Sequence, residues 1–233
     1  MFSVKLVSVM LMERWIRGVS LTIVLTLMLL SNRFINLGDV QRVLDLAELI
    51  VLIFAVLKLS GYSREELGLG GGFDLVKHVL FPFAFLILPL AVVLAVPHKS
   101  VSLKVFLLYT LNFILIAGIP EELLFRSLLL ASLEERFGWN VALLGTSISH
   151  WLAHVFVGLN ASQLIASFIL TTYRLTFRRV EPLIIIHALW DVTFVVLKPK
   201  FTGYSSLFVI VPLIGGLLLS LFVFLVEEIQ RKG

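Results

Sequence analysis

Long apolar stretches separated by short polar segments dominate this chain. The pattern predicts helices over residues 19–30, 46–59, 78–96, 101–118, 119–133, 141–159, 163–173, 183–197 and 206–226. About 20 apolar residues cross a bilayer, so a chain of 233 residues fits seven or eight crossings joined by short connections. We therefore expect an all-α fold, a polytopic transmembrane bundle of about eight helices.

Prolines and charged segments set the expected helix boundaries. Pro82 and Pro89 fall inside one apolar stretch, where transmembrane helices tolerate proline as a kink. Pro120 begins a new helix, because its missing N–H costs little in the first turn. That helix is expected to end before the polar residues 134–136. Residues 1–17 mix apolar and charged positions and predict an amphipathic helix at the membrane surface.

The predicted helices form one unit. We expect a single integral membrane domain over residues 1–233, with N-terminal helices in residues 1–100 and a C-terminal helix in residues 205–227. Residues 101–195 between them carry the polar motifs described below and form the catalytic-motif core. No internal repeat is visible.

Composition strengthens the membrane assignment. The chain is 59% hydrophobic and only 15% charged, whereas a soluble domain is about 25% charged. We expect a multi-pass protein of the cell membrane. The net charge of +4 comes from Lys and Arg placed mainly between apolar stretches, which suits contact with lipid headgroups and requires no nucleic acid. Cysteine is absent, which excludes disulfides, thiolate ligands and a cysteine nucleophile.

Three apolar stretches carry ionisable residues at a spacing of four. They are Glu122 with Arg126, preceded by Glu121; His150 with His154; and His187 with Asp191. This spacing places both members of a pair on one helix face. An Arg, Lys or Asp at the centre of a membrane helix costs roughly 2.5 to 3.5 kcal/mol, so such residues indicate function. We expect them to meet in a polar cavity between helices.

The two adjacent glutamates have different expected roles. They point about 100° apart on a helix. Arg126 lies four residues beyond Glu122, the favourable order for an ion pair, which leaves Glu121 facing the bundle centre as a candidate general base. The alternative is an ion pair that closes a helix end at the membrane interface.

The histidines allow two kinds of chemistry. His150 and His154 have a spacing found among zinc ligands, and together with His187 and Glu121 they form a candidate metal set. Alternatively, one of the two positions a water while the other packs. Three of the chain's five histidines fall in these apolar helices, which favours function over packing.

The third pair can support a charge that develops during a reaction. If Asp191 orients His187, the imidazole gains a fixed tautomer and a stabilised cation, which suits it to stabilise an oxyanion or carry a proton. The alternative is a polar clamp between helices.

In this order and on separate apolar helices, the motifs resemble those of the CAAX protease and bacteriocin-processing family of intramembrane proteases, also called the Abi family. Residues 121–126, Glu-Glu-Leu-Leu-Phe-Arg, match its first motif, EExxxR. The second motif, FxxxH, matches at His154, with His150 where phenylalanine is usual. His187 and Asp191 match the third, a histidine followed four residues later by Asn or Asp.

The resemblance covers roughly residues 101–195 and implies an all-helical membrane core. In this core the first glutamate and the second-motif histidine activate a water, while the third-motif pair stabilises the oxyanion. With Asp191 in place of Asn, the resemblance favours orientation of His187 over direct donation to the oxyanion. Carried over, the catalytic residues are Glu121, His154, His187 and Asp191, and the supporting residues are Glu122, Arg126 and His150.

The sequence therefore predicts an intramembrane endopeptidase, a hydrolase resembling CAAX prenyl proteases. Its substrate is expected to be a peptide or protein tail, lipidated or hydrophobic, that enters the lipid region. No cofactor is expected, with zinc as the alternative. The competing function is a non-catalytic binding or immunity protein, or an ion or proton carrier that uses the same cavity.

Overall fold

The computed structural model describes residues 13–32, 40–80, 90–91, 93–156, 158–200 and 207–232. Within these residues it contains eight α-helices and no strands, which confirms the all-helical prediction. The α-helices are α2 (Arg14–Asn32), α3 (Val40–Phe54), α5 (Leu103–Phe113), α6 (Ile119–Glu121), α7 (Leu130–Leu152), α8 (Ala161–Phe177), α9 (Glu181–Val195) and α10 (Leu207–Lys232). π-helical segments adjoin them at η1 (Ala55–Leu59), η2 (Val76–Leu80), η3 (Ile114–Gly118) and η4 (Glu122–Leu129). Most of the expected surface helix over residues 1–17 lies outside the described residues. The expected proline kinks at Pro82 and Pro89 lie outside them as well.

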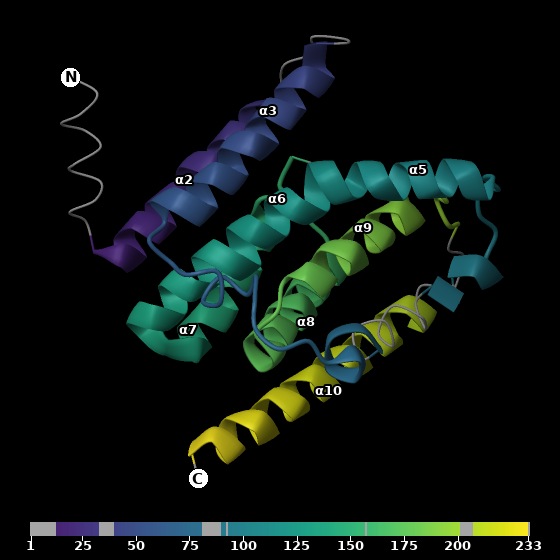
Figure 1. Cartoon of the computed structure of the whole chain (residues 1–233). Helices are drawn as coiled ribbons and strands as arrows, with labels where there is room; N and C mark the ends of the chain where they lie inside the picture. Colours follow the sequence, from purple (N-terminus) through teal and green to yellow (C-terminus); the bar gives the residue numbers. More distant parts are fainter. Residues whose placement is uncertain are drawn as a thin grey trace.

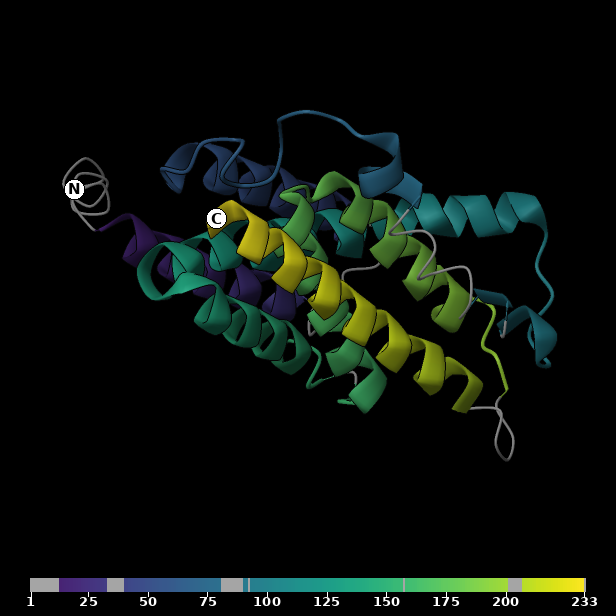
Figure 2. The ribbon, with the colours of Figure 1, turned by 90° about the horizontal axis from the view of Figure 1, so that it is seen from below.

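Most helices pack in pairs around the segment that carries the two glutamates. α8 contacts both α7 and α10, α9 contacts α5 and η3, and α2 contacts α7 and η4 (Figures 1 and 2). Among the residues that the structure describes, two helical runs are long and apolar enough to cross a membrane, Arg14–Ser31 and a stretch within Leu103–Leu152. Large apolar side chains on their outer faces are exposed, as expected for lipid contact: Ile23 by 55% and Leu107 by 56%.

The helix around Pro120 is widened on both sides. The N–H of Ile119 bonds to the carbonyl of Ile114, five residues back instead of four, and the widened geometry resumes at Glu122. Proline removes a backbone donor from the helical ladder, so a local change in hydrogen-bond register is expected beside it. π-helical turns are rare and often mark functional sites. Here one π-helical segment ends at Gly118, just before the short helix that carries Glu121, and the next begins at Glu122.

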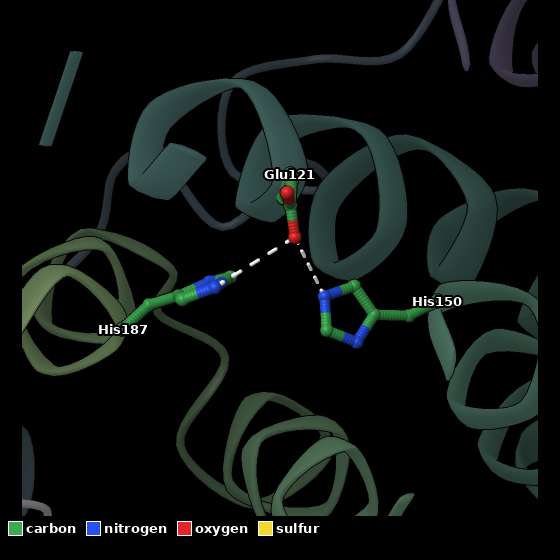
Figure 3. Close-up of side chains that lie close together, drawn as sticks. All are labelled: Glu121, His150 and His187. Carbon is green, nitrogen blue, oxygen red and sulfur yellow. Dashed lines mark hydrogen bonds and ion pairs between the residues drawn. The ribbon is translucent and has the colours of Figure 1, made fainter. Parts of the chain in front are cut away.

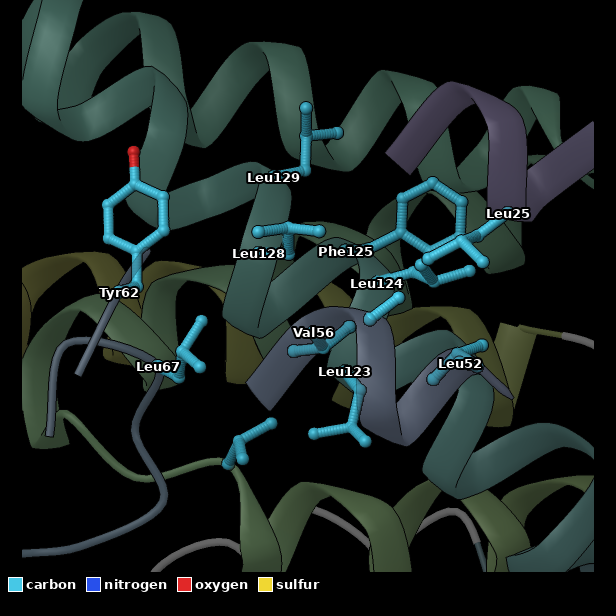
Figure 4. Packing of buried hydrophobic residues seen from close by; sticks show 12 residues of the cluster. Leu25, Leu52, Val56, Tyr62, Leu67, Leu123, Leu124, Phe125, Leu128 and Leu129 are labelled. Carbon is cyan, nitrogen blue, oxygen red and sulfur yellow. The ribbon is translucent and has the colours of Figure 1, made fainter. Parts of the chain in front are cut away.

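An apolar core holds the η4 segment in place. All eight residues of η4 are buried. Leu124 and Leu128 have no exposed surface and pack in one cluster with Leu52 of α3 and Val56 of η1 (Figure 4). Truncating a buried leucine to alanine typically costs about 2–5 kcal/mol, so this cluster fixes the helix on which the glutamates lie.

The expected helix end before residues 134–136 is wrong. The helix continues through these residues only to Gly138, whose non-helical φ of +78° suits glycine and divides α7 into two helical stretches. The chain turns back there, because a Cβ at Gly145 would lie 2.8 Å from Cδ1 of Leu133. Glu134 and Glu135 are good helix formers, and each forms an ion pair with an arginine from another segment. The same helix ends at Leu152, earlier than the predicted boundary at residue 159.

Gly118 marks the closest approach between the helices that carry the site. A Cβ atom there would lie 2.7 Å from the carbonyl oxygen of Ile184 on α9, whereas a Cβ at Gly215 on α10 would meet nothing within 4 Å. Alanine at position 118 is expected to lower stability by about 1–3 kcal/mol through overpacking, and to lower any cleavage activity. Alanine at position 215 should be neutral or stabilising, because alanine is the better helix former. Thermal unfolding in detergent compares the two, and equal midpoints would contradict a close helix crossing at Gly118.

Candidate active site

Three imidazole rings surround one carboxylate oxygen. Glu121 lies in the short helix α6 and is 8% exposed. Its Oε2 lies 2.9 Å from Nε2 of His150, 3.6 Å from Nε2 of His154 and 3.7 Å from Nε2 of His187. Figure 3 shows His150 and His187 approaching this oxygen from two sides. The structure thus brings together residues from three separate predicted helices.

The neighbouring Glu122 points into the protein and forms the expected ion pair. Its Oε1 accepts hydrogen bonds from Nη1 of Arg126 at 3.1 Å and from Nδ1 of His187 at 2.8 Å. Neither Glu122 nor Arg126 has any exposed surface. A buried pair of this kind is stable only when both partners are present, because either charge alone is costly to bury.

The second ring nitrogen of His150 lies in a polar contact that the sequence analysis missed. Its Nδ1 is 3.2 Å from Nη2 of Arg126 and 3.1 Å from Oγ of Ser167 on α8. Nη2 of Arg126 also donates to the Ser167 oxygen at 2.9 Å. Single serines are common in membrane helices, and the spacing of Ser167 from the three motifs carries no signal.

His154 lies just beyond the end of α7, in the turn that follows Leu152. Its Nδ1 donates to the backbone carbonyl of His150 at 3.0 Å, and its side chain is 17% exposed. The four-residue spacing therefore still directs His150 and His154 toward Glu121, although the regular helix ends between them.

His187 of the third motif forms its hydrogen bond with a residue other than the expected Asp191. Nε2 of His187 lies 3.6 Å from Oδ2 of Asp191, which is an ion-pair distance and too long for a hydrogen bond. The hydrogen bond of His187 goes to Glu122 instead, a residue 65 positions earlier in the chain. Asp191 is the most exposed of these groups, with 27% of its side-chain surface accessible.

A cavity of about 940 Å³ opens onto this cluster. It is lined by all five residues of the carboxylate–histidine group and by apolar and aromatic side chains from the surrounding helices. The polar lining includes Glu121, His150, His154, His187 and Asp191, and the aromatic lining consists of Phe113, Trp190 and Phe194. The cluster therefore forms part of the cavity wall, which also carries polar residues outside the cluster, such as Gln41, Asp45 and Gln163.

One subset of these residues has the spacing of a metal site. Ligand atoms of Glu121, His150 and His187 all lie within 4.8 Å of one another, and two histidines with one carboxylate is a known zinc set. A metal-bound histidine normally donates its other N–H to an acceptor. His187 does so toward Glu122, and Nδ1 of His150 has the oxygen of Ser167 at 3.1 Å as an acceptor. The buried guanidinium of Arg126 lies 3.2 Å from the same nitrogen, and its positive charge disfavours a divalent cation on this ring, so we derive no metal-dependent step.

These features define a class of protein: a chain that is all-helical over the described residues, with candidate membrane spans and a buried carboxylate–imidazole site in the wall of a cavity. Residues 103–193 match the family model described as type II CAAX prenyl endopeptidase Rce1-like. The chain thus carries, over these residues, a domain of the Rce1-like type II CAAX prenyl endopeptidase family, which is a family of hydrolases and membrane proteins. This confirms the resemblance found in the sequence motifs. Comparison with curated proteins and with solved structures found no match.

Proposed function

We propose that the protein is an intramembrane endopeptidase that hydrolyses a peptide bond with a water activated by Glu121 and His154. The proposal rests on one observation: Oε2 of Glu121 and Nε2 of His154 lie 3.6 Å apart, and both residues line the cavity. Nδ1 of His154 must carry a proton, because its partner is a carbonyl oxygen. In the neutral ring Nε2 then has a free lone pair, and a water in the cavity can donate one hydrogen bond to it and one to the carboxylate.

The reaction follows from these positions. The water oxygen attacks the carbonyl carbon of the scissile peptide bond while Nε2 of His154 accepts its proton, with the Glu121 carboxylate stabilising the resulting imidazolium. When the C–N bond breaks, the same nitrogen returns the proton to the leaving amine. The products are a new carboxyl terminus and a new amino terminus.

In this proposal, His187 stabilises the oxyanion that forms during attack. Its Nδ1 donates to Glu122, so its Nε2 can donate to an oxyanion only in the protonated ring. Carboxylates within 3.7 Å, those of Glu121 and Asp191, favour that cationic form. Asp191 therefore acts through His187 in this scheme.

The cavity also suggests the kind of substrate. Its volume of about 940 Å³ is near the upper end of the roughly 300–1,000 Å³ found for ligand pockets, and Phe113, Trp190 and Phe194 contribute apolar surface. We propose a peptide or protein tail with a hydrophobic or lipidated segment that reaches the site from the membrane.

A peptide-library assay with the purified protein, with and without a chelator, tests this function. We expect released fragments and the same rate in both conditions, because no step uses a metal. A rate that falls on chelation and recovers with added zinc would contradict the metal-free reaction. Binding of peptides without cleavage, or ion flux across liposomes, would contradict the proposed function and favour a binding protein or a carrier.

A further inference from the structure

The proton positions on His150 follow from its partners. Nη2 of Arg126 is a donor in every protonation state, and it lies 3.2 Å from Nδ1 of His150. The hydroxyl of Ser167 already donates to the carbonyl of Ser147 at 3.1 Å. On the other side of the ring, the ionised carboxylate of Glu121 can only accept, so Nε2 of His150 carries a proton and donates it over 2.9 Å. In the neutral ring Nδ1 is then unprotonated and accepts from Nη2 of Arg126.

With this arrangement of protons, His150 does not act as a base in the site. Its Nε2, the nitrogen nearest the carboxylate, already holds a proton and has no lone pair for water. A further proton on Nδ1 would face the buried guanidinium of Arg126. The ring is thus suited to donate one fixed hydrogen bond and unsuited to accept a proton from water.

The backbone carbonyl of His150 also fixes the tautomer of His154. The carbonyl oxygen of His150 accepts the hydrogen bond from Nδ1 of His154 at 3.0 Å. This contact leaves Nε2 of His154 as the unprotonated nitrogen toward Glu121. A substitution of the His150 side chain keeps this carbonyl, so the two effects of residue 150 can be separated by experiment.

We infer that His150 is a positioning residue that holds Glu121 through a fixed Nε2–H donor, with the Glu121 carboxylate and the Arg126 guanidinium on its two sides fixing the tautomer. The inference rests on the proposed function, because the group being positioned is the proposed water-activating carboxylate. Phenylalanine, which is usual at this position in the motif that the chain resembles, would keep the carbonyl contact to His154 but would lose the donor. Glu121 of this chain is therefore held by a hydrogen bond that such a motif lacks.

Three matched variants test the role of His150. His150→Gln places an amide N–H donor near the position of Nε2 and cannot titrate, so kcat should stay within about tenfold of the unsubstituted protein. His150→Met has similar length without a donor, and kcat should fall about tenfold to a hundredfold with little change in KM, the size expected for one hydrogen bond to a charged group. His154→Gln removes the proposed base and should lower kcat by about 10²–10⁴-fold. Thermal unfolding in detergent identifies any variant that fails to fold.

The outcomes separate this inference from the proposed function. If folded His150→Gln is as inactive as His154→Gln, or if His150→Met is fully active, the positioning role is overturned while the proposed function stands. If His154→Gln keeps full activity, the proposed function itself fails. Nitrogen-15 NMR of histidine-labelled protein in lipid provides a readout that needs no activity. Nδ1 of His78 also accepts a hydrogen bond, from the backbone N–H of Asp74, so its unprotonated signal stays in every variant. We expect a second unprotonated Nδ1 signal that disappears in His150→Gln, and a protonated Nδ1 at His150 would overturn the inference.

Discussion

Replacing Glu121 with glutamine is expected to lower kcat by about 10²–10⁴-fold, the range typical for removing a general base or its partner. Glutamine keeps the size of the side chain but loses the negative charge that faces three imidazole rings. The rate of fragment release by the purified variant measures the effect. Because the amide can still accept a hydrogen bond from His150, the variant should fold and insert like the unsubstituted protein.

A matched substitution outside the site controls for the loss of a carboxylate. Glu65 is an exposed glutamate in the loop that follows η1 and is not among the residues that line the cavity. Glu65→Gln should leave the rate unchanged. Full activity of Glu121→Gln beside an unchanged Glu65→Gln would remove Glu121 from the reaction and end the proposed mechanism.

The largest expected effect on stability comes from breaking the buried ion pair. Arg126→Met leaves the fully buried Glu122 without its guanidinium partner, and Glu122→Gln leaves Arg126 without its carboxylate. Each single change should lower the free energy of unfolding by about 3–5 kcal/mol, because the charge that remains in the interior loses its ion-pair partner across the 3.1 Å contact. Equilibrium unfolding in detergent micelles measures the loss.

The double variant separates ion pairing from simple packing. With both charges removed, Glu122→Gln with Arg126→Met should lose clearly less than the sum of the two single losses. Additive losses would mean that the two side chains do not stabilise one another across the 3.1 Å contact. Both single variants should also reduce activity, since Glu122 binds His187 and Arg126 contacts His150.

Hydropathy was sufficient to predict much of this fold. The predicted helix over residues 183–197 corresponds to α9 (Glu181–Val195), and the one over residues 206–226 overlaps α10 (Leu207–Lys232). Apolar length is a strong signal because a membrane helix must satisfy its backbone internally. The charged segment 134–136 misled the prediction, since its charges find partners on other elements and the bend occurs at Gly138.

The four-residue spacing was enough to predict that the three motifs meet. It could not predict which atoms form hydrogen bonds, because that depends on how α6, α7 and α9 cross. The bond from His187 to Glu122, in place of one to Asp191, is a product of that crossing. Ser167 was missed for the same reason, since a lone serine becomes notable only when Arg126 and His150 are seen beside it. The roles of the individual site residues remain predictions.

The central claim is that Glu121 and His154 act on one water. Cleavage rates of Glu121→Gln, His154→Gln and the double variant test it most directly, measured by mass spectrometry of the released fragment over long incubations. Residues that act as one unit have non-additive effects, so the double variant should be about as active as the worse single variant. If the two losses multiply instead, the carboxylate and the imidazole act independently, and the shared water is not the basis of the reaction.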